Sequence, residues 1–222
     1  MNKFMSIFYI SIALVICPRL ISAETFDQNS ATLTNAYLPI KVGDKLTYKT
    51  YGYPFVLYAY IEAIDQEIVD QVNCLKIRQS DSFSSTAIVY YWFAEDTSGN
   101  IRVLKYHDQE LNDLRYYGRD GAKLVMPSKV NIGTILWNPD GTETIVAAGI
   151  AVPELSTGLG PFYNCIKTKI SYADKDIDYN YYAPQIGQIK FEFNDDGGIN
   201  GLEISEIFRR STSMPWLQLL LE

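Results

Sequence analysis

One pattern occurs twice along the chain, and this repetition constrains the fold more than any other feature of the sequence. The motif Gly43-x-x-Leu46 returns as Gly133-x-x-Leu136. The first glycine precedes Cys74 by 31 residues, and the second precedes Cys165 by 32. Each cysteine follows an asparagine and has a lysine two positions later. Shared spacing over this length indicates a duplicated structural unit.

The same order of features continues after each cysteine. An aromatic run at 90–94 corresponds to one at 181–183, and each leads through a glycine to a strand-like segment at 101–103 or 189–191. A period near 90 residues is too long for the repeat of a solenoid. We therefore predict two tandem β-meanders, residues 37–107 and 126–208, each of which contributes about half of one sheet.

Runs of β-branched and aromatic residues, separated by Asx- and Gly-rich turns, predict a mainly β fold. We expect nine strands, at residues 45–51, 55–63, 72–79, 86–94, 101–106, 163–171, 177–183, 188–193 and 202–208. Residues 108–117 and 216–221 are predicted to form short helices. Because proteins avoid open sheet edges, we expect a single curved antiparallel sheet or a partly closed β-barrel, with a two-sheet sandwich as the alternative.

The first 23 residues have the three parts of a signal peptide. A positive start at Lys3 is followed by an apolar run at 4–16 and a small-residue site that ends at Ala23. The run is shorter than the ~20 residues that span a bilayer. We predict cleavage after Ala23 and a periplasmic or extracellular location without a transmembrane anchor. A lipid anchor at Cys17 is disfavoured because Ile16 stands where a small residue is required.

The mature chain is predicted to hold a flexible N-terminal lead, residues 24–36, and a single β domain, residues 37–222. Within that domain, residues 108–125 connect the two repeats and residues 209–222 form a C-terminal tail. Removal of the signal peptide takes away two positive charges and no acid, so the formal charge falls from −7 to −9. This acidic balance argues against a nucleic-acid partner, which requires clustered Lys and Arg.

The second half resembles a pattern found in uncharacterised bacterial exported proteins. The matching stretches are Ile132-Gly133-x-x-Leu136-Trp137, Thr142-Glu143-Thr144, Val152-Pro153, Phe162-Tyr163-Asn164-Cys165 and Tyr181-Tyr182-Ala183-Pro184-x-x-Gly187-x-x-Lys190. The chain departs from that pattern after Pro153, where residues 154–161 form a longer loop. The fold is similar to the half-barrels of lipoprotein-localisation factors, which hold an acyl chain in a concave face. The resemblance implies an apolar or lipid-like ligand.

Aromatic residues supply the candidate binding site. Of the 17 tyrosines, many cluster on predicted strands, where alternate residues share one face of a sheet. An aromatic-lined groove for an apolar or mixed ligand is one interpretation, and the ordinary packing of tyrosine in half-buried sheets is the other. The candidate ligand-binding residues are Tyr58, Tyr60, Tyr91, Trp92, Tyr179 and Tyr181.

Residues with catalytic or metal-binding potential do not form a recognisable constellation. His107 is the chain's one histidine, and no nucleophile motif accompanies it. Asp174, Asp176 and Asp178 alternate, but the glycine and distal glutamate of an EF-hand are missing, so we interpret them as a charged hairpin tip. The loop at 154–161 is expected to be mobile and to lie over one barrel end. We predict no catalytic residue, metal or cofactor.

These observations favour a non-enzymatic exported binding protein whose curved sheet presents an aromatic concave face to an apolar or mixed ligand. The alternative is a structural or interaction component of a cell-envelope assembly, with an envelope protein as its partner. A hydrolase ranks last because no nucleophile–base pair can be named.

The two cysteines of the mature chain are predicted to be free. Export permits a disulfide. However, residues at equivalent positions of two repeats lie several strands apart in a sheet, and a disulfide requires Cα atoms within ~7 Å. Period-two alternation also places Cys74 on the face opposite to Leu75 and Ile77, and gives Cys165 the same orientation.

Overall fold

The computed structural model describes residues 25–26, 32–82, 84, 86–174, 176–195 and 198–210. The predicted signal peptide with its cleavage site, Cys17 and the predicted helix at 216–221 lie outside these residues. So does most of the predicted tail at 209–222. Part of the predicted lead at 24–36 lies inside them, and two of its residues, Thr32 and Leu33, form a short strand.

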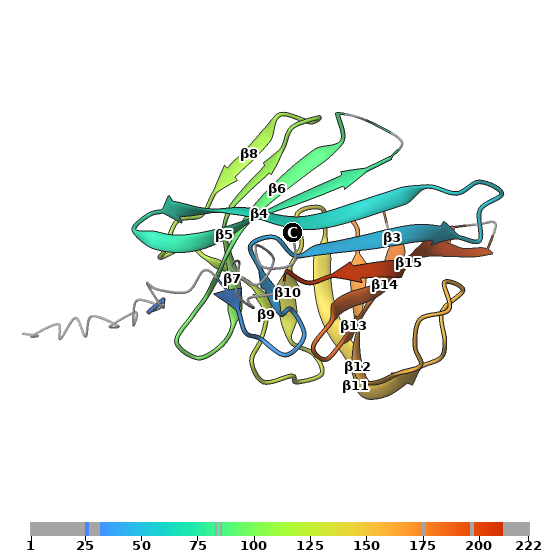
Figure 1. The fold of residues 1–222 in the computed structure, drawn as a ribbon. Coiled ribbons are helices and arrows are strands. Elements are labelled where there is room, and N and C mark those ends of the chain that lie inside the picture. The colour runs from blue at the N-terminus through green and yellow to red at the C-terminus, as the bar shows by residue number, and fades with distance from the viewer. Residues whose placement is uncertain are drawn as a thin grey trace, which may run out of the picture.

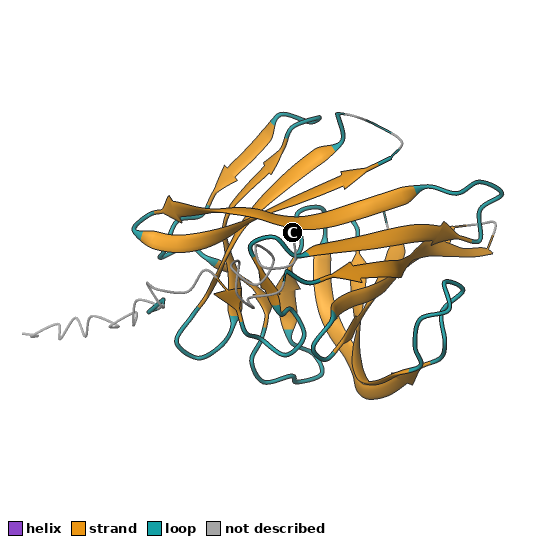
Figure 2. Cartoon of the chain, viewed as in Figure 1, coloured by secondary structure: helices purple, strands orange, loops and turns teal. Residues whose placement is uncertain are grey.

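The described residues form strands, turns and loops, and Figure 2 shows no helix among them. The strands are β1 (Thr32–Leu33), β2 (Ile40–Lys41), β3 (Lys45–Tyr51), β4 (Tyr58–Val69), β5 (Val72–Asp81), β6 (Ile88–Glu95), β7 (Ile101–Asp108), β8 (Asp113–Tyr116), β9 (Lys123–Met126), β10 (Ile135–Trp137), β11 (Thr142–Val152), β12 (Phe162–Ser171), β13 (Ile177–Ala183), β14 (Gly187–Asp195) and β15 (Gly198–Phe208).

Thirteen of these strands make one antiparallel sheet, which confirms the predicted mainly β class. Its order is β10-β11-β12-β13-β14-β15-β3-β4-β5-β6-β7-β8, with β9 paired to β7. The last strand, β15, pairs with β3 from Gly201↔Tyr51 to Phe208↔Lys45, and this ladder joins the two halves of the chain. Figure 1 shows the halves as a blue-to-green block and a yellow-to-red block of the same curved sheet.

The sheet curls until its two ends meet through side chains, without closing into a barrel. Trp137 on β10, at one end, packs edge-on against Tyr106 and Tyr117 near the other end, with ring centroids 5.6 and 5.8 Å apart. Its indole Nε1 donates a hydrogen bond of 3.1 Å to the Tyr117 hydroxyl. Among the described strands, β10 forms a backbone ladder with β11 alone. The predicted sandwich alternative is therefore not adopted.

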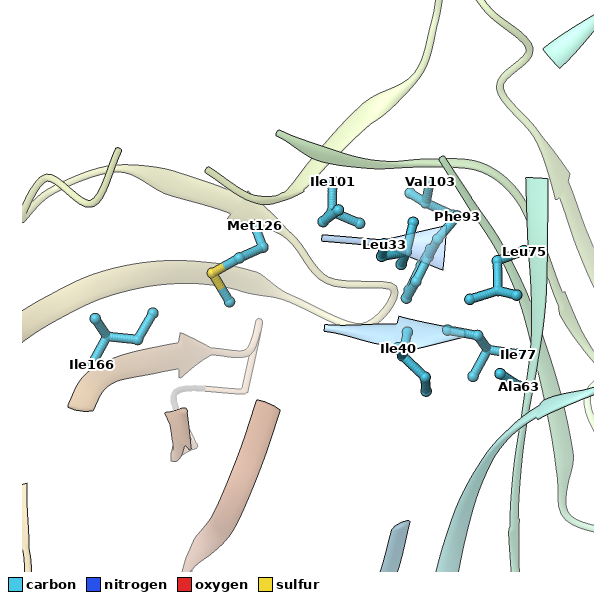
Figure 3. Packing of buried hydrophobic residues seen from close by; sticks show 10 residues of the cluster. All are labelled: Leu33, Ile40, Ala63, Leu75, Ile77, Phe93, Ile101, Val103, Met126 and Ile166. Carbon is cyan, nitrogen blue, oxygen red and sulfur yellow. The ribbon is translucent and has the colours of Figure 1, made fainter. Parts of the chain in front are cut away.

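A short hairpin of β1 and β2 enters the space that the sheet encloses. Leu33 and Ile40, paired as neighbours across this hairpin, are 2% and 4% exposed. They pack in one buried cluster with residues that include Leu75, Ile77 and Phe93, as Figure 3 shows. Burial of apolar surface stabilises a fold by roughly 25 cal/mol per Å². The apolar contacts between this hairpin and the sheet therefore help to keep the sheet curved around it.

The two motif glycines take the same backbone conformation. Gly43 and Gly133 both have φ of 90°, a conformation that L side chains rarely adopt. Gly43 N donates to the carbonyl of Ala63 and Gly133 N to that of Ile145, each at 2.8 Å. The turns are thus alike in geometry, whereas equivalence of the whole meanders stays a prediction. Trp137, which directly follows the second Gly-x-x-Leu motif, is half-buried.

The predicted helix at 108–117 is wrong. Residues Asp108 and Asp113 pair as the first rung of the β7–β8 hairpin, and Asn112 adopts a φ of 51° in the turn. Asparagine tolerates this left-handed region, so a tight turn is available where we expected helical backbone. The four strands between β7 and β12, which are β8 to β11, were also not predicted.

Both described cysteines are free, as predicted, and both are fully buried. Their strands, β5 and β12, are separated in the sheet by five others. Cys74 packs with Val72 and Trp92, whereas its neighbour Leu75 belongs to the cluster around Ile77. Alternate residues therefore point to opposite faces here, as the sequence pattern indicated.

Thiol titration checks this arrangement. In the denatured, unreduced mature protein we expect two groups that react with a thiol reagent. In the folded protein at neutral pH we expect neither to react readily, because burial raises the pKa of Cys74 to about 12 and also raises the pKa of Cys165. A denatured protein without reactive thiols would contradict the assignment.

Candidate functional site

A cavity of about 450 Å³ lies inside the curve of the sheet. Strands from both halves of the chain line it, together with the β1–β2 hairpin and the segment after β10. Its lining is mainly apolar and aromatic: Leu38, Pro39, Ile40, Leu46, Tyr48, Ala59, Ile61, Ile77, Gln79, Tyr91, Phe93, Val125, Met126, Trp137, Asn138, Pro139, Glu143, Asn180, Tyr182, Ile186, Gln188, Phe191, Phe193 and Leu202.

Aromatic rings form one wall of this cavity. Tyr91 on β6 lies 5.4 Å from Phe93 and 6.3 Å from Trp137, measured between ring centroids. Burial raises the pKa of Tyr91 well above its usual value, and the nearby Tyr106 adds to this shift. Its phenol therefore stays neutral. The wall presents ring faces and edges together with hydroxyl groups.

A polar network is centred on Glu143 of β11, in the second half of the chain. Glu143 is 5% exposed. Its Oε1 accepts hydrogen bonds from Thr168 Oγ1 at 2.5 Å, Asn180 Nδ2 at 3.0 Å and the Tyr182 hydroxyl at 3.3 Å. Gln188 extends the network by donating to Asn180 Oδ1 at 2.7 Å. Burial, followed by the charge of Glu143, raises the pKa of Tyr182 well above its usual value, so Tyr182 remains a donor.

The side chains of a strand alternate between the two faces of the sheet, and this explains why the Glu143 carboxylate lies on the inner face. On β11, Glu143 and Ile145 are buried, while Thr142 before them is exposed. On β12 the buried residue that bonds Glu143 is Thr168, which pairs across the ladder with Asn180 of β13. Three neighbouring strands thus direct polar side chains to the same face of the sheet.

A second cavity of about 460 Å³ continues from the first. The two share lining residues Ala59, Gln79, Phe193 and Leu202. The segment between β3 and β4 adds Tyr53 and Phe55, whose rings stack with centroids 5.4 Å apart. Because Phe55 is 53% exposed, this end is the more open part of the apolar surface.

Of the six aromatic residues predicted to bind ligand, two line a cavity and four do not. Tyr91 lines the first cavity, and Tyr58 lines the second. The other four, Tyr60, Trp92, Tyr179 and Tyr181, line neither cavity. Sequence reasoning did not single out Tyr48, Trp137 or Tyr182, which line the first cavity.

Those four residues contact lysines instead. Lys45 Nζ lies 4.4 Å from the ring centroid of Tyr60, and Lys167 Nζ lies 3.8 Å from that of Tyr179 and 4.9 Å from that of Tyr181. The Tyr181 hydroxyl also donates to Glu192 Oε2 at 2.6 Å. These contacts are cation–π pairs and hydrogen bonds of the kind that stabilise a sheet surface.

The remaining predicted candidates do not assemble into a site. The His107 ring stacks on Tyr90 at 6.4 Å. Asp174 Oδ1 accepts a bond from the backbone N–H of Asp176 at 3.2 Å, as in a hairpin tip. Among the described residues, no group of three or more His, Cys, Asp or Glu side chains could hold a metal ion.

The loop at 154–161 is tied to the sheet by several contacts. The backbone N–H and hydroxyl of Ser156 both donate to Glu203 Oε2, at 2.7 and 2.6 Å. Thr157 Oγ1 donates to the carbonyl of Ile204 at 2.7 Å, and Leu155 is 6% exposed. These bonds attach the middle of the loop to β15.

Comparisons with known proteins give one structural match. No family model and no curated protein matches the sequence. A crystal structure from Bacteroides fragilis, of a candidate exported protein with a YmcC-like fold, matches with a TM-score of 0.38 and 14% identity. The match covers 79% of this chain and 100% of that one. Within the described part of the chain, no helix is long and apolar enough to cross a membrane.

Proposed function

We propose that this chain is an exported, non-enzymatic binding protein that takes an amphipathic ligand into the cavity inside its curved sheet. The supporting observation is the cavity itself, whose walls are predominantly aliphatic and aromatic with one cluster of polar groups. Binding sites for small molecules have this character, and their volumes are typically about 300–1,000 Å³. The 450 Å³ cavity lies in that range.

Apolar burial would supply most of the binding free energy. Each methylene group moved from water into such a cavity contributes about 0.8 kcal/mol. The second cavity, which shares Ala59 and Leu202 with the first, gives a longer apolar tail room to continue. A ligand with an extended hydrocarbon part therefore fits this surface better than a compact polar one.

Export is part of the proposal. The signal-peptide pattern that ends at Ala23 supports cleavage and a periplasmic or extracellular location for the mature chain. In that setting a protein with a concave apolar surface can carry or sense a poorly soluble molecule. The repeated meander and the Tyr-Tyr-Ala-Pro motif support membership of a wider group of exported β proteins.

A cavity-filling substitution tests the binding proposal. In Ala59→Trp, the new indole occupies space that both cavities share, so we expect the affinity for the neutral fluorescent probe N-phenyl-1-naphthylamine to fall by about tenfold or more. Fluorescence titration of the mature protein measures this change. The control is Ala148→Trp, which places the same ring at an exposed position of β11.

Two results would contradict the proposal. One is a wild-type protein that does not bind the probe, which would favour the alternative of an envelope-assembly component without a small-molecule site. The other is equal loss of affinity in both variants, which would show that the effect does not come from the cavity. Circular dichroism of each variant confirms that the fold is retained.

A further inference from the structure

Glu143 is the one formally charged residue among the described residues that line the first cavity. The lining contains no lysine, arginine, histidine or aspartate. The other polar side chains there are the amides of residues such as Gln79, Asn180 and Gln188, together with tyrosine hydroxyls and one tryptophan indole, and none of these groups is a cation. Any charged group on a ligand inside this cavity therefore meets a single negative charge and no positive one.

The hydrogen bonds to Glu143 leave half of its carboxylate available. All three donors, from Thr168, Asn180 and Tyr182, reach Oε1. Within the described part of the chain, no donor reaches Oε2 and no lysine or arginine forms an ion pair with this residue. A carboxylate that is 95% buried without a cationic partner is costly unless another group compensates it. A donor on a ligand can provide that compensation.

The aromatic wall favours the same kind of ligand. Tyr91 and Trp137 line the cavity together with Glu143, and Tyr182 both lines it and donates to the carboxylate. Cations are attracted to the faces of such rings, most strongly to tryptophan, and the attraction grows when water is excluded. Carboxylate and aromatic rings together are the components with which proteins recognise organic ammonium groups.

We propose that the ligand of this cavity is a cationic amphiphile, in which an ammonium group pairs with Glu143 and an apolar body fills the rest. The inference rests on the proposed binding function and names its ligand class. It assigns Glu143 as the residue that selects the charge of the ligand. Anionic amphiphiles such as fatty acids are disfavoured, because their carboxylate would face Glu143 without a counter-charge.

Three ligands with the same hydrocarbon chain test this proposal. Dodecylamine, dodecanol and dodecanoate, each below the concentration at which it aggregates, compete at neutral pH for the site of N-phenyl-1-naphthylamine in the full mature protein. For wild type we expect dodecylamine to bind about tenfold more tightly than dodecanol, and dodecanoate to bind most weakly.

The variant Glu143→Gln removes the charge and keeps the oxygen that accepts from Thr168, Asn180 and Tyr182. We expect it to lose the preference for dodecylamine over dodecanol, measured as the ratio of the two affinities in the same variant. The matched control is Glu206→Gln, which removes one negative charge at an exposed position of β15 and should keep the preference.

The outcomes separate the two proposals. If the neutral probe binds but dodecylamine binds no more tightly than dodecanol, the ammonium assignment is wrong and the binding function stands. If the preference survives in Glu143→Gln, another group sets it and the assignment is also wrong. If no probe binds the wild type, the binding function itself fails. Should Glu143→Gln not fold, the order of the three ligands on wild type still decides.

Discussion

Replacement of Trp92 by alanine should lower the free energy of unfolding by about 3–5 kcal/mol, the usual cost of removing a buried tryptophan. Trp92 is 3% exposed and packs with Val72, Cys74 and Leu104 on the side of the sheet away from the cavity. Its indole Nε1 also donates to Glu67 Oε2 at 2.8 Å. Urea denaturation followed by circular dichroism measures the loss.

The variant Trp92→Phe is the matched control. It keeps an aromatic ring in the cluster but loses the bond to Glu67, so we expect a smaller loss of about 1–2 kcal/mol. Neither variant should change the affinity for the neutral probe, because Trp92 does not line the cavity. If Trp92→Ala left the stability unchanged but abolished probe binding, the placement of Trp92 outside the cavity would be wrong. Trp92 would then again be a candidate ligand-binding residue.

Replacement of Asp96 by alanine should cost about 3 kcal/mol, because several hydrogen bonds converge on this buried carboxylate. Asp96 is 8% exposed. Its Oδ1 accepts from the backbone N–H groups of Ser98 and Asn100 at 2.9 and 3.0 Å, and its Oδ2 accepts from Arg102 Nε at 2.9 Å. These bonds hold the turn between β6 and β7. Asp96→Asn retains one acceptor oxygen and should therefore lose less stability than Asp96→Ala.

The same contacts make the free energy of unfolding depend on pH in the acidic range. Burial alone would raise the pKa of Asp96, but bonds from Asn100 and Arg102, together with the backbone bonds, lower it below its usual 3.8. Because the pKa of Asp96 is lower in the folded protein than in the unfolded chain, its ionised carboxylate stabilises the fold at pH values above the pKa of the unfolded chain. This stabilisation is lost as the pH falls through the pKa of the folded protein. Between about pH 5 and about pH 3 wild type should therefore lose more stability than Asp96→Asn. Equal losses would contradict this role.

The strands that the sequence predicted well are those with uninterrupted aromatic and β-branched residues. The bounds of β3 and β13 were predicted without error. β11 was not predicted, because Ala147, Ala148 and Gly149 in its second half have low strand propensity. Pairing with β12 through three register shifts forms the strand nevertheless. Long-range pairing of this kind overrides local propensity and cannot be seen in a single segment.

The candidate site was harder to predict than the fold, for a geometric reason. Alternation shows which residues share a face of a strand, but not which face lies inside the curve. Of two adjacent tyrosines on β13, Tyr182 lines the cavity and Tyr181 does not. Glu143 carried a usable signal, since it stands in phase with Ile145 on a strand. That signal has meaning only once residues 142–152 are recognised as a strand.

A crystal structure of the mature protein with a bound bromoalkane tests whether ligands bind inside the curved sheet, because the anomalous scattering of bromine locates the ligand directly. We predict a bromine site inside the curved sheet, within van der Waals contact of residues such as Leu46, Tyr91 and Leu202. A cavity filled by the protein's own side chains, with bromine on the outer surface alone, would contradict it.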